Sequence, residues 1–158
     1  MVNGFFAKAS IISGNQGAFL KELNGLTQLA LDQDKGNYNF REIYNPNTGA
    51  PDGGWQNGIH WNSCKLQTWS ATAYINMIIF GLVGIRIEND RIEFSPYLPE
   101  TTHYLELRDL NYHQSTLNII IKGHGSKIKS FLLNGKSQKN HSIDSKIKGT
   151  NEIKIELE

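Results

Sequence analysis

The spacing of apolar residues changes near residue 82, and this change restricts the fold more than any other feature of the sequence. Before it, apolar side chains recur at helical spacing, as on an amphipathic helix that covers a core. After it, apolar and polar side chains alternate, which is typical of strands with one buried face. The sequence therefore predicts an α+β fold, with helices in 1–82 and a β-rich region in 83–158.

Two helices are predicted in the first region, from about Gln16 to Leu31 and from about Leu66 to Phe80. Ser63 offers an N-terminal cap for the second of these helices and Gly81 a stop signal. The segment from Met1 to Ile12 is interpreted as the remnant of another helix. The apolar stripe of the first predicted helix consists of Phe19, Leu20, Leu23, Leu26 and Ala30.

The second region contains six strand candidates, and we expect them to form an antiparallel sheet or a small sandwich. The first two flank the polar sequence Glu88-Asn89-Asp90, which suggests a hairpin. Asn134-Gly135 is a strong turn signal between two later strands. The candidates are 85–87, 92–94, 104–110, 116–121, 128–133 and 153–157.

The two predicted helices are joined by a segment of about thirty residues, Asp34 to Lys65, which is rich in Gly, Asn, Pro and aromatic residues. A connection this long without regular structure is usually functional in a compact domain. Its aromatic rings can stack on sugar faces, and its amides and carboxylates can bind hydroxyl groups. This mixture is the one expected around a polyol ligand.

Composition and charge exclude several classes of protein. The formal net charge is +1, and the sixteen Lys and Arg residues are scattered, which argues against nucleic acid and anionic lipid as partners. The longest apolar run, Ile75 to Val83, is interrupted by polar or small residues and is too short to cross a bilayer, so a soluble chain is predicted. Met1 to Ser10 is too short for a secretory signal, and the compartment stays open.

Metal and nucleotide chemistry lack support in the sequence. Cys64 is the only cysteine, so neither a disulfide within the chain nor a cysteine-based metal cluster is expected. The histidines show no pair at i, i+4 and no Cys or Asp at metal-ligand spacing. No Gly-x-Ser-x-Gly elbow and no phosphate-cradling loop occurs. We therefore expect no metal site and no cofactor. The five histidines are His60, His103, His113, His124 and His141.

Three stretches together resemble bacterial glycoside hydrolases related to family 63 and the trehalase-like enzymes, including those similar to mannosylglycerate hydrolase. Residues 41–49 (REIYNPNTG) are close to the family's Glu-x-Tyr-Asn-Pro-x-Thr-Gly segment. Residues 67–74 (QTWSATAY) look like the start of the last helix of the barrel. Residues 80–86 (FGLVGIR), leading to 94–99 (FSPYLP), resemble the exit from the barrel into a β-rich tail that related phosphorylases and rhamnosidases share.

This resemblance implies that the chain is the C-terminal part of a longer enzyme. Residues 1–82 would supply the last helices and an active-site loop of a truncated (α/α)6, or six-hairpin, catalytic barrel, and 83–158 the β-rich C-terminal domain. Such enzymes cleave α-linked sugars by inversion, with one carboxylic acid and one carboxylate on opposite faces of the sugar. Glu42 would be the general base, and the general acid would lie upstream in the missing barrel helices.

The two candidate bases of the long segment, Glu42 and Asp52, each have an alternative interpretation. The alternative interpretation of Glu42 is a solvated loop carboxylate or the partner of Arg41. Asp52 is the rival candidate for the base, but Pro51-Asp52-Gly53 is first of all a turn sequence. After Gly49 the sequence also departs from the family 63 pattern, which affects the identity of the substrate more than the fold.

Seven further residues are predicted to bind the substrate. The aromatic residues among them could instead fill the end of the barrel as core. Trp69, at helical spacing with Ala73, is interpreted as core, with Gln67 the polar contact at the start of that helix. The predicted substrate-binding residues are Tyr44, Asn45, Trp55, Asn57, His60, Trp61 and Gln67.

Two other functions remain open. The chain could be a non-catalytic carbohydrate-binding remnant, since it lacks the general acid. It could also belong to a sugar phosphorylase, although Gly36 to Ser63 holds only Arg41 as a cation for phosphate. The expected partners are a carbohydrate substrate and either the missing N-terminal barrel or another chain, which would cover exposed helix faces. Phe5, Phe6, Phe19 and Leu23 are the residues expected to be exposed on those faces.

Overall fold

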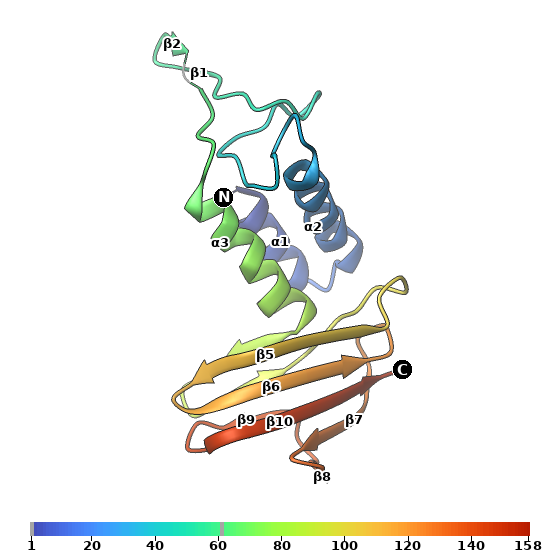
Figure 1. Cartoon of the computed structure of the whole chain (residues 1–158). Coiled ribbons are helices and arrows are strands. Elements are labelled where there is room, and N and C mark those ends of the chain that lie inside the picture. The colour runs from blue at the N-terminus through green and yellow to red at the C-terminus, as the bar shows by residue number, and fades with distance from the viewer. Residues whose placement is uncertain (1, 61) are drawn as a thin grey trace. The chain divides into compact units, whose positions relative to one another are not determined.

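A computed structural model describes residues 2–60 and 62–158, and describes Trp55 and Gln56 by their backbone alone. The chain divides into two compact units, 1–78 and 79–158, which are described separately below. Helices occupy the first unit and strands the second, so the fold is α+β, as predicted (Figure 1). Among the described residues, no helix is both long enough and apolar enough to cross a membrane.

The first unit contains three α-helices: α1 Val2–Ile12, α2 Gln16–Leu31 and α3 Thr68–Asn76. Asn15 caps α2, because its side-chain oxygen accepts a hydrogen bond of 3.1 Å from the Ala18 N–H. Both α1 and α2 lie where the sequence predicts helices. The third helix begins two positions later than predicted, at Thr68, with Gln67 in the N-cap position.

The predicted ends of the third helix need two corrections. Ser63 does not cap it: no side chain bonds the N-terminus of α3 at the cap position, and the Ser63 hydroxyl bonds the backbone of Ile43 instead. Gly81 does not stop it either, because a π-helical segment, η1 Met77–Leu82, continues directly from α3 and includes Gly81.

Helix α1 packs on both α2 and α3. At the contact with α3, a Cβ atom on Gly4 would lie 2.7 Å from the Ala73 Cβ, so only glycine allows this approach. The Thr27 hydroxyl, on α2, lies 2.9 Å from the Tyr74 hydroxyl, on α3. These contacts make the three helices one packed unit.

The expectation that four apolar residues of α1 and α2 are exposed is half right. Phe5 and Phe6 keep 66% and 52% of their surface exposed. Phe19 and Leu23, in contrast, are buried, at 1% and 6%. The apolar stripe of α2 thus has a partner within this chain, whereas the two phenylalanines of α1 do not have one among the described residues.

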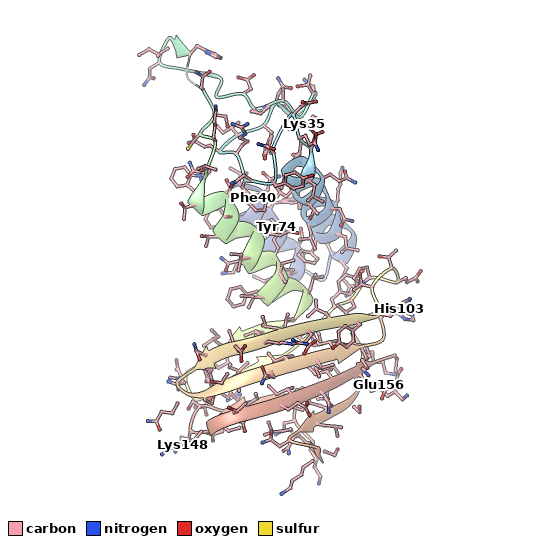
Figure 2. All side chains as sticks on the ribbon, viewed as in Figure 1. Lys35, Phe40, Tyr74, His103, Lys148 and Glu156 are labelled. Carbon is pink, nitrogen blue, oxygen red and sulfur yellow. The ribbon has the colours of Figure 1, made fainter. Side chains whose placement is uncertain are left out.

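Residues 33–67 connect α2 to α3 with little regular structure, as predicted. The exception is a short antiparallel hairpin of β1 Trp55–Gln56 and β2 Ile59–His60. The segment is anchored near α3, since the Gln67 N–H bonds the Phe40 carbonyl at 3.0 Å. The Phe40 ring also lies 4.9 Å from the Tyr74 ring of α3, centroid to centroid (Figure 2).

The second unit contains eight strands among its described residues. All six predicted strands are present, and the two that the prediction missed, β8 and β9, have two and three residues. The strands are β3 Ile85–Ile87, β4 Arg91–Phe94, β5 Tyr104–Tyr112, β6 Gln114–Lys122, β7 Ile128–Leu133, β8 Lys136–Ser137, β9 Ser142–Asp144 and β10 Lys148–Leu157.

The strands form a five-stranded sheet in the order β5-β6-β10-β7-β8 and a three-stranded sheet in the order β3-β4-β9. One pairing contradicts the predicted antiparallel arrangement: β10 runs parallel to β6, with Ile153 opposite Ile119. The larger sheet is therefore mixed, and β10 is its central strand (Figure 1). A parallel pair is possible because β6 and β10 are joined through β7, β8 and β9 and not through a tight turn.

The core of the second unit lies between its two sheets. Strands β6 and β10 bury alternate residues, among them Ile119 and Ile153, which have no exposed surface. The Phe94 ring of the smaller sheet lies 5.4 Å from the Phe131 ring of the larger one, centroid to centroid. Contact between inner faces is the arrangement of a β-sandwich, which is consistent with the prediction.

Among the glycines of this unit with positive φ, Gly135 and Gly84 have it for different reasons. Asn134 and Gly135 have φ of 50° and 75° and form the tight turn between β7 and β8, as the sequence predicts. Gly84 has φ of 72°, and a Cβ atom there would overlap the backbone carbonyl of Ser95. The Gly84 carbonyl in turn accepts a hydrogen bond of 2.8 Å from the Ser95 N–H.

Candidate functional site

The candidate site is a cavity of about 950 Å³ in the first unit. Its size lies within the range of small-molecule sites, roughly 300–1,000 Å³. Three of its lining residues carry an aromatic ring or a carboxylate that the sequence analysis considered, namely Glu42, Tyr44 and Trp69. The side chains with charged or polar groups that line it are Asn3, Gln28, Asp32, Lys35, Arg41, Glu42, Tyr44, Asn45 and Ser70.

Glu42 is held in the wall of this cavity through its backbone. Its N–H donates a hydrogen bond of 3.1 Å to the Cys64 carbonyl. The neighbouring residue, Ile43, exchanges two hydrogen bonds with the Ser63 hydroxyl, at 2.9 Å and 2.7 Å. Among the described residues, the Glu42 carboxylate accepts one long hydrogen bond, 3.5 Å from the Cys64 N–H to Oε2. The main chain is thus fixed while the carboxylate keeps free acceptor capacity.

Tyr44 and Arg41 lie next to Glu42 in the same wall. The Tyr44 hydroxyl accepts a hydrogen bond of 3.1 Å from the Arg41 N–H, and its own proton remains available to a ligand. The Arg41 guanidinium donates through Nε to the Lys35 carbonyl at 2.9 Å. Glu42 is not among the partners of Arg41 that the structure shows, so the interpretation of these two residues as an ion pair gains no support.

Asp32 and Lys35 form the charged pair of the cavity, with 3.0 Å between Nζ and Oδ2. This hydrogen bond from Lys35 is the main reason why the pKa of Asp32 is lowered, and the N–H groups of Lys35 and Asp34 add to it. Burial opposes the shift in part. Asp32 therefore stays ionised at neutral pH. The sequence predicts a site role for neither residue: Asp32 caps the end of α2, ahead of the segment from Asp34 to Lys65, and Lys35 lies at the very start of that segment.

Asn45 lines the cavity, but its side chain is used within the chain. Its Oδ1 accepts from the N–H groups of Asn47 and Thr48, at 2.9 Å and 3.1 Å. Its amide group donates to Asp52. The arrangement is an Asx turn, in which an asparagine side chain takes the place of a backbone turn. Asn45 thus has little capacity left for the sugar contact predicted for it, which stays untested.

Asp52 lies in the turn that its sequence predicts, and its carboxylate is held by three groups. The Gly54 N–H donates to Oδ1 at 2.9 Å and is the main cause of its lowered pKa, followed by the Asn45 side chain and by His60. The His60 Nε2 lies 3.7 Å from Oδ1. Asp52 is not among the residues that line the cavity, so the rival carboxylate points elsewhere than Glu42.

The remaining predicted site residues lie apart from the cavity or outside the described residues. Asn57 and His60 are exposed on the β1–β2 hairpin, and Gln67 is at the N-terminus of α3 without lining the cavity. Trp61 lies outside the described residues, as does the side chain of Trp55. The structure thus brings Glu42, Tyr44 and Asn45 to one cavity and does not bring Asn57, His60 or Gln67 to it.

The prediction that Trp69 belongs to the core is wrong, because 47% of its surface is exposed and it lines the cavity. The helical spacing with Ala73 is real, since both residues line the same cavity. A stripe at helical spacing shows that residues share a helix face, but not whether that face meets a core or a hollow.

No group of three or more His, Cys, Asp or Glu side chains that could hold a metal ion occurs within residues 2–60 and 62–158. The cavity itself offers the carboxylates of Asp32 and Glu42, the hydroxyls of Tyr44 and Ser70, two cationic side chains and aromatic surface.

Comparison with known proteins gives two matches, and both concern glycosidase-related sequences. Residues 85–138, within the β-rich unit, match the family described as glycosyl hydrolase family 65, C-terminal domain. The chain is also 39% identical over 46 residues to a protein-glucosylgalactosylhydroxylysine glucosidase of Dictyostelium discoideum. That alignment covers 29% of this chain and 6% of the relative, so the chain spans only a small part of the relative's length.

The fold of the β-rich unit and these two matches support a C-terminal domain related to those of glycoside hydrolases. One match concerns family 65 and the other a glucosidase. Neither match supports the more specific similarity to family 63 and trehalase-like enzymes. Neither match assigns a role to any residue of the cavity.

Proposed function

We propose that this chain is the C-terminal part of an inverting glycoside hydrolase that acts on an α-linked sugar, with Glu42 as its general base. One observation carries the proposal: Glu42 lines a cavity of about 950 Å³ together with the aromatic residues Tyr44 and Trp69. The match of residues 85–138 to a glycosyl hydrolase C-terminal domain supports the class of reaction.

A general base must hold a water molecule against the anomeric carbon and accept its proton. The environment of Glu42 supports this role, since its backbone is fixed by Cys64 while its carboxylate has one long hydrogen bond. A carboxylate with unused acceptor positions can bind a water molecule and orient it. Stacking on Tyr44 and Trp69 would hold the sugar ring above it.

The general acid must come from outside this chain. Besides Glu42, the carboxylate that lines the cavity among the described residues is Asp32. Its pKa is lowered by Lys35, so it lacks the proton that a general acid donates to the leaving oxygen. In an inverting enzyme the acid would stand roughly 6.5–9.5 Å from Glu42, which leaves room for the water molecule.

The helices of an (α/α)6 barrel upstream of this chain, or another chain, would supply that acid. Exposed apolar side chains on α1 and α3 support such a partner, because a monomeric protein rarely exposes large apolar patches. The exposed residues are Val2, Phe5, Phe6 and Ile12 on α1 and Trp69 and Ile75 on α3. Without the partner, we expect the chain to bind sugar weakly and to hydrolyse nothing.

A sugar phosphorylase is the second candidate, and the cations of the cavity favour it. The sequence segment considered for phosphate binding contains only Arg41, but Lys35 also lines the cavity. The Nζ of Lys35 is paired with Asp32, whereas the two Nη groups of Arg41 have no protein partner among the described residues. A phosphate ion would take the place of the water molecule, and no general base would be needed.

The test compares hydrolysis and phosphorolysis in the full-length protein that contains this chain. Glu42→Gln keeps the shape of the side chain and removes its basicity, so kcat for hydrolysis should fall by roughly 10² to 10⁴ while sugar binding survives. If activity instead requires phosphate, releases a sugar phosphate and survives Glu42→Gln, the phosphorylase is the correct function. If the full-length protein binds sugar but transforms none, the chain belongs to a non-catalytic carbohydrate-binding protein.

A further inference from the structure

Two histidines that are far apart in the sequence lie side by side at one end of the β-rich unit. The rings of His103 and His124 have their centroids 5.7 Å apart and their planes at 82°. Both residues are exposed to solvent, and Figure 2 labels His103 at the end of the larger sheet. The proposed glycosidase function makes no use of either residue.

The backbone around both histidines is held by hydrogen bonds. His103 directly precedes β5, and its carbonyl accepts a hydrogen bond of 3.1 Å from the Gly123 N–H. His124 lies between Gly123 and Gly125, and the latter exchanges two hydrogen bonds with Leu98, at 3.0 Å and 2.7 Å. A Cβ atom on Gly123 would overlap the carbonyl oxygen of Leu157, so this approach requires glycine. The two histidine side chains therefore project from backbone positions that are held by hydrogen bonds.

The separation of the rings suits a shared metal ion. A histidine nitrogen binds zinc at roughly 2.0–2.1 Å, which places the ion about 3 Å from the centre of each ring and the two ring centres roughly 5–6 Å apart. The observed 5.7 Å falls in this range. Imidazole suits divalent transition metals such as zinc, copper and nickel, whereas magnesium prefers oxygen ligands.

The other exposed histidines of this unit have different neighbours. The His113 ring lies 4.5 Å from the ring of Tyr112, and the His141 ring lies 5.8 Å from that of Phe131. Neither tyrosine nor phenylalanine is among the usual protein ligands of zinc. His113 is thus a suitable control, because it is an exposed histidine in the turn between β5 and β6, and the ring contact found for it is with Tyr112.

We propose that His103 and His124 form a two-imidazole site for one divalent transition-metal ion, with water completing its coordination. The ion bridges the beginning of β5 and the connection between β6 and β7, so it stabilises the β-rich unit. It is a structural site, and its existence does not depend on the proposed function of the cavity.

The experiment is a titration of the untagged full chain with ZnCl₂, followed by calorimetry and by the NMR signals of the histidine rings. We expect one zinc ion per chain and a shift of two histidine rings together, complete at one equivalent. His103→Gln and His124→Gln should each weaken binding at least tenfold, because one imidazole holds the ion far less well than two. His113→Gln should bind as the unchanged chain does, and MgCl₂ should shift neither ring.

Absence of zinc binding in the unchanged chain, or binding that survives both single substitutions, would overturn the proposal. Thermal unfolding provides the second measurement. The melting temperature of the β-rich unit should rise with zinc concentration in the unchanged chain and in His113→Gln, and not in His103→Gln. Circular dichroism of each variant without metal shows that it is folded, and both histidines are exposed, so their substitution leaves the core intact.

Discussion

The Ser63 hydroxyl and the backbone of Ile43 are joined by two hydrogen bonds, although twenty residues separate them in the sequence. The hydroxyl accepts from the Ile43 N–H at 2.9 Å and donates to the Ile43 carbonyl at 2.7 Å. Ser63 is 7% exposed, so water does not replace these bonds readily. This contact closes the long segment between α2 and α3 into a loop and fixes the residue next to Glu42.

Ser63→Ala should therefore destabilise the helical unit and loosen the wall of the cavity. It removes two part-buried hydrogen bonds, each of which contributes roughly 0.5–1.5 kcal/mol to the free energy of unfolding. Chemical denaturation measures the loss, and hydrogen exchange of the Glu42 and Ile43 amides shows where it acts. Ser126→Ala, at an exposed serine, is the control and should change nothing measurable. Unchanged exchange at Ile43 in Ser63→Ala would contradict the role of this contact.

Glu42→Gln and Asp52→Asn distinguish the two candidates for the general base. In the full-length protein, Glu42→Gln should lower kcat by roughly 10² to 10⁴ with little change in the binding of the sugar. Asp52→Asn should leave kcat nearly unchanged, because Asp52 is held by the Gly54 N–H, Asn45 and His60 and lies off the cavity. The reverse result, with activity lost only in Asp52→Asn, would move the general base to Asp52.

Lys35→Met should raise the pKa of Asp32 toward the ordinary value of 3.8, because the hydrogen bond from Lys35 is the main cause of the lowered pKa. A carboxyl group whose pKa is lowered by folding adds stability at pH values above its unfolded pKa, and the contribution is lost as the pH falls through the folded pKa. The difference in stability between Lys35→Met and the unchanged chain should therefore shrink below about pH 4. NMR titration of the Asp32 carboxyl carbon measures the pKa directly. Equal pKa values in the two proteins would show that Lys35 does not hold Asp32.

Gly84→Ala and Gly135→Ala separate two costs of replacing a glycine at positive φ. The two residues have nearly the same φ, 72° and 75°, but only Gly84 faces a backbone carbonyl at contact distance, that of Ser95. Gly135→Ala should cost about 1–2 kcal/mol, the strain of the left-handed conformation. Gly84→Ala should cost at least about 1 kcal/mol more, from overpacking. Urea denaturation of the β-rich unit tests this order, and equal costs would show that the backbone at Ser95 gives way easily.

Phe5→Ser and Phe19→Ser test which apolar residues of the helices are exposed for contact with another chain and which are buried within this one. Phe5 is 66% exposed, so its replacement should change stability by no more than about 0.5 kcal/mol and should reduce self-association. Phe19 is 1% exposed, and its loss should cost roughly 3–5 kcal/mol and unfold the helical unit. Sedimentation velocity and denaturation measure the two effects. If Phe5→Ser does not affect self-association, the surface that mediates it does not include Phe5.

The sequence predicts the kinds of elements well, because the two periods measure which side chains share a face. Helix α2 has the predicted bounds, and the residues of β6 and β10 alternate as expected. The same period cannot show direction, since a parallel and an antiparallel neighbour bury the same side of a strand. This is why the parallel pairing of β10 with β6 was not predicted. Strands β8 and β9 are too short to show a period at all.

The candidate site was predicted only in part, for a similar reason. The motif at 41–49 locates Glu42 and Tyr44, and both line the cavity. The sequence did not predict the roles of Asp32, at the end of α2, and Trp69, on α3. Their roles depend on how these helices contact the loop, which no local sequence pattern indicates. Asn45 was predicted to contact sugar from its chemistry alone, whereas the Asx turn at Asn47 and Thr48 uses that chemistry for the chain itself.

The central place of β10 in the larger sheet has a consequence for biosynthesis. Both of its neighbours, β6 and β7, precede it in the chain, so the ribosome delivers them before the strand that joins them. Until Lys148–Leu157 emerges, β6 and β7 present unpaired backbone groups to the surrounding solution, which is the situation that favours association between nascent chains. The β-rich unit can therefore complete its folding only after Lys148–Leu157 has been translated. A nascent chain that ends before Lys148 would leave β6 and β7 without the strand that joins them.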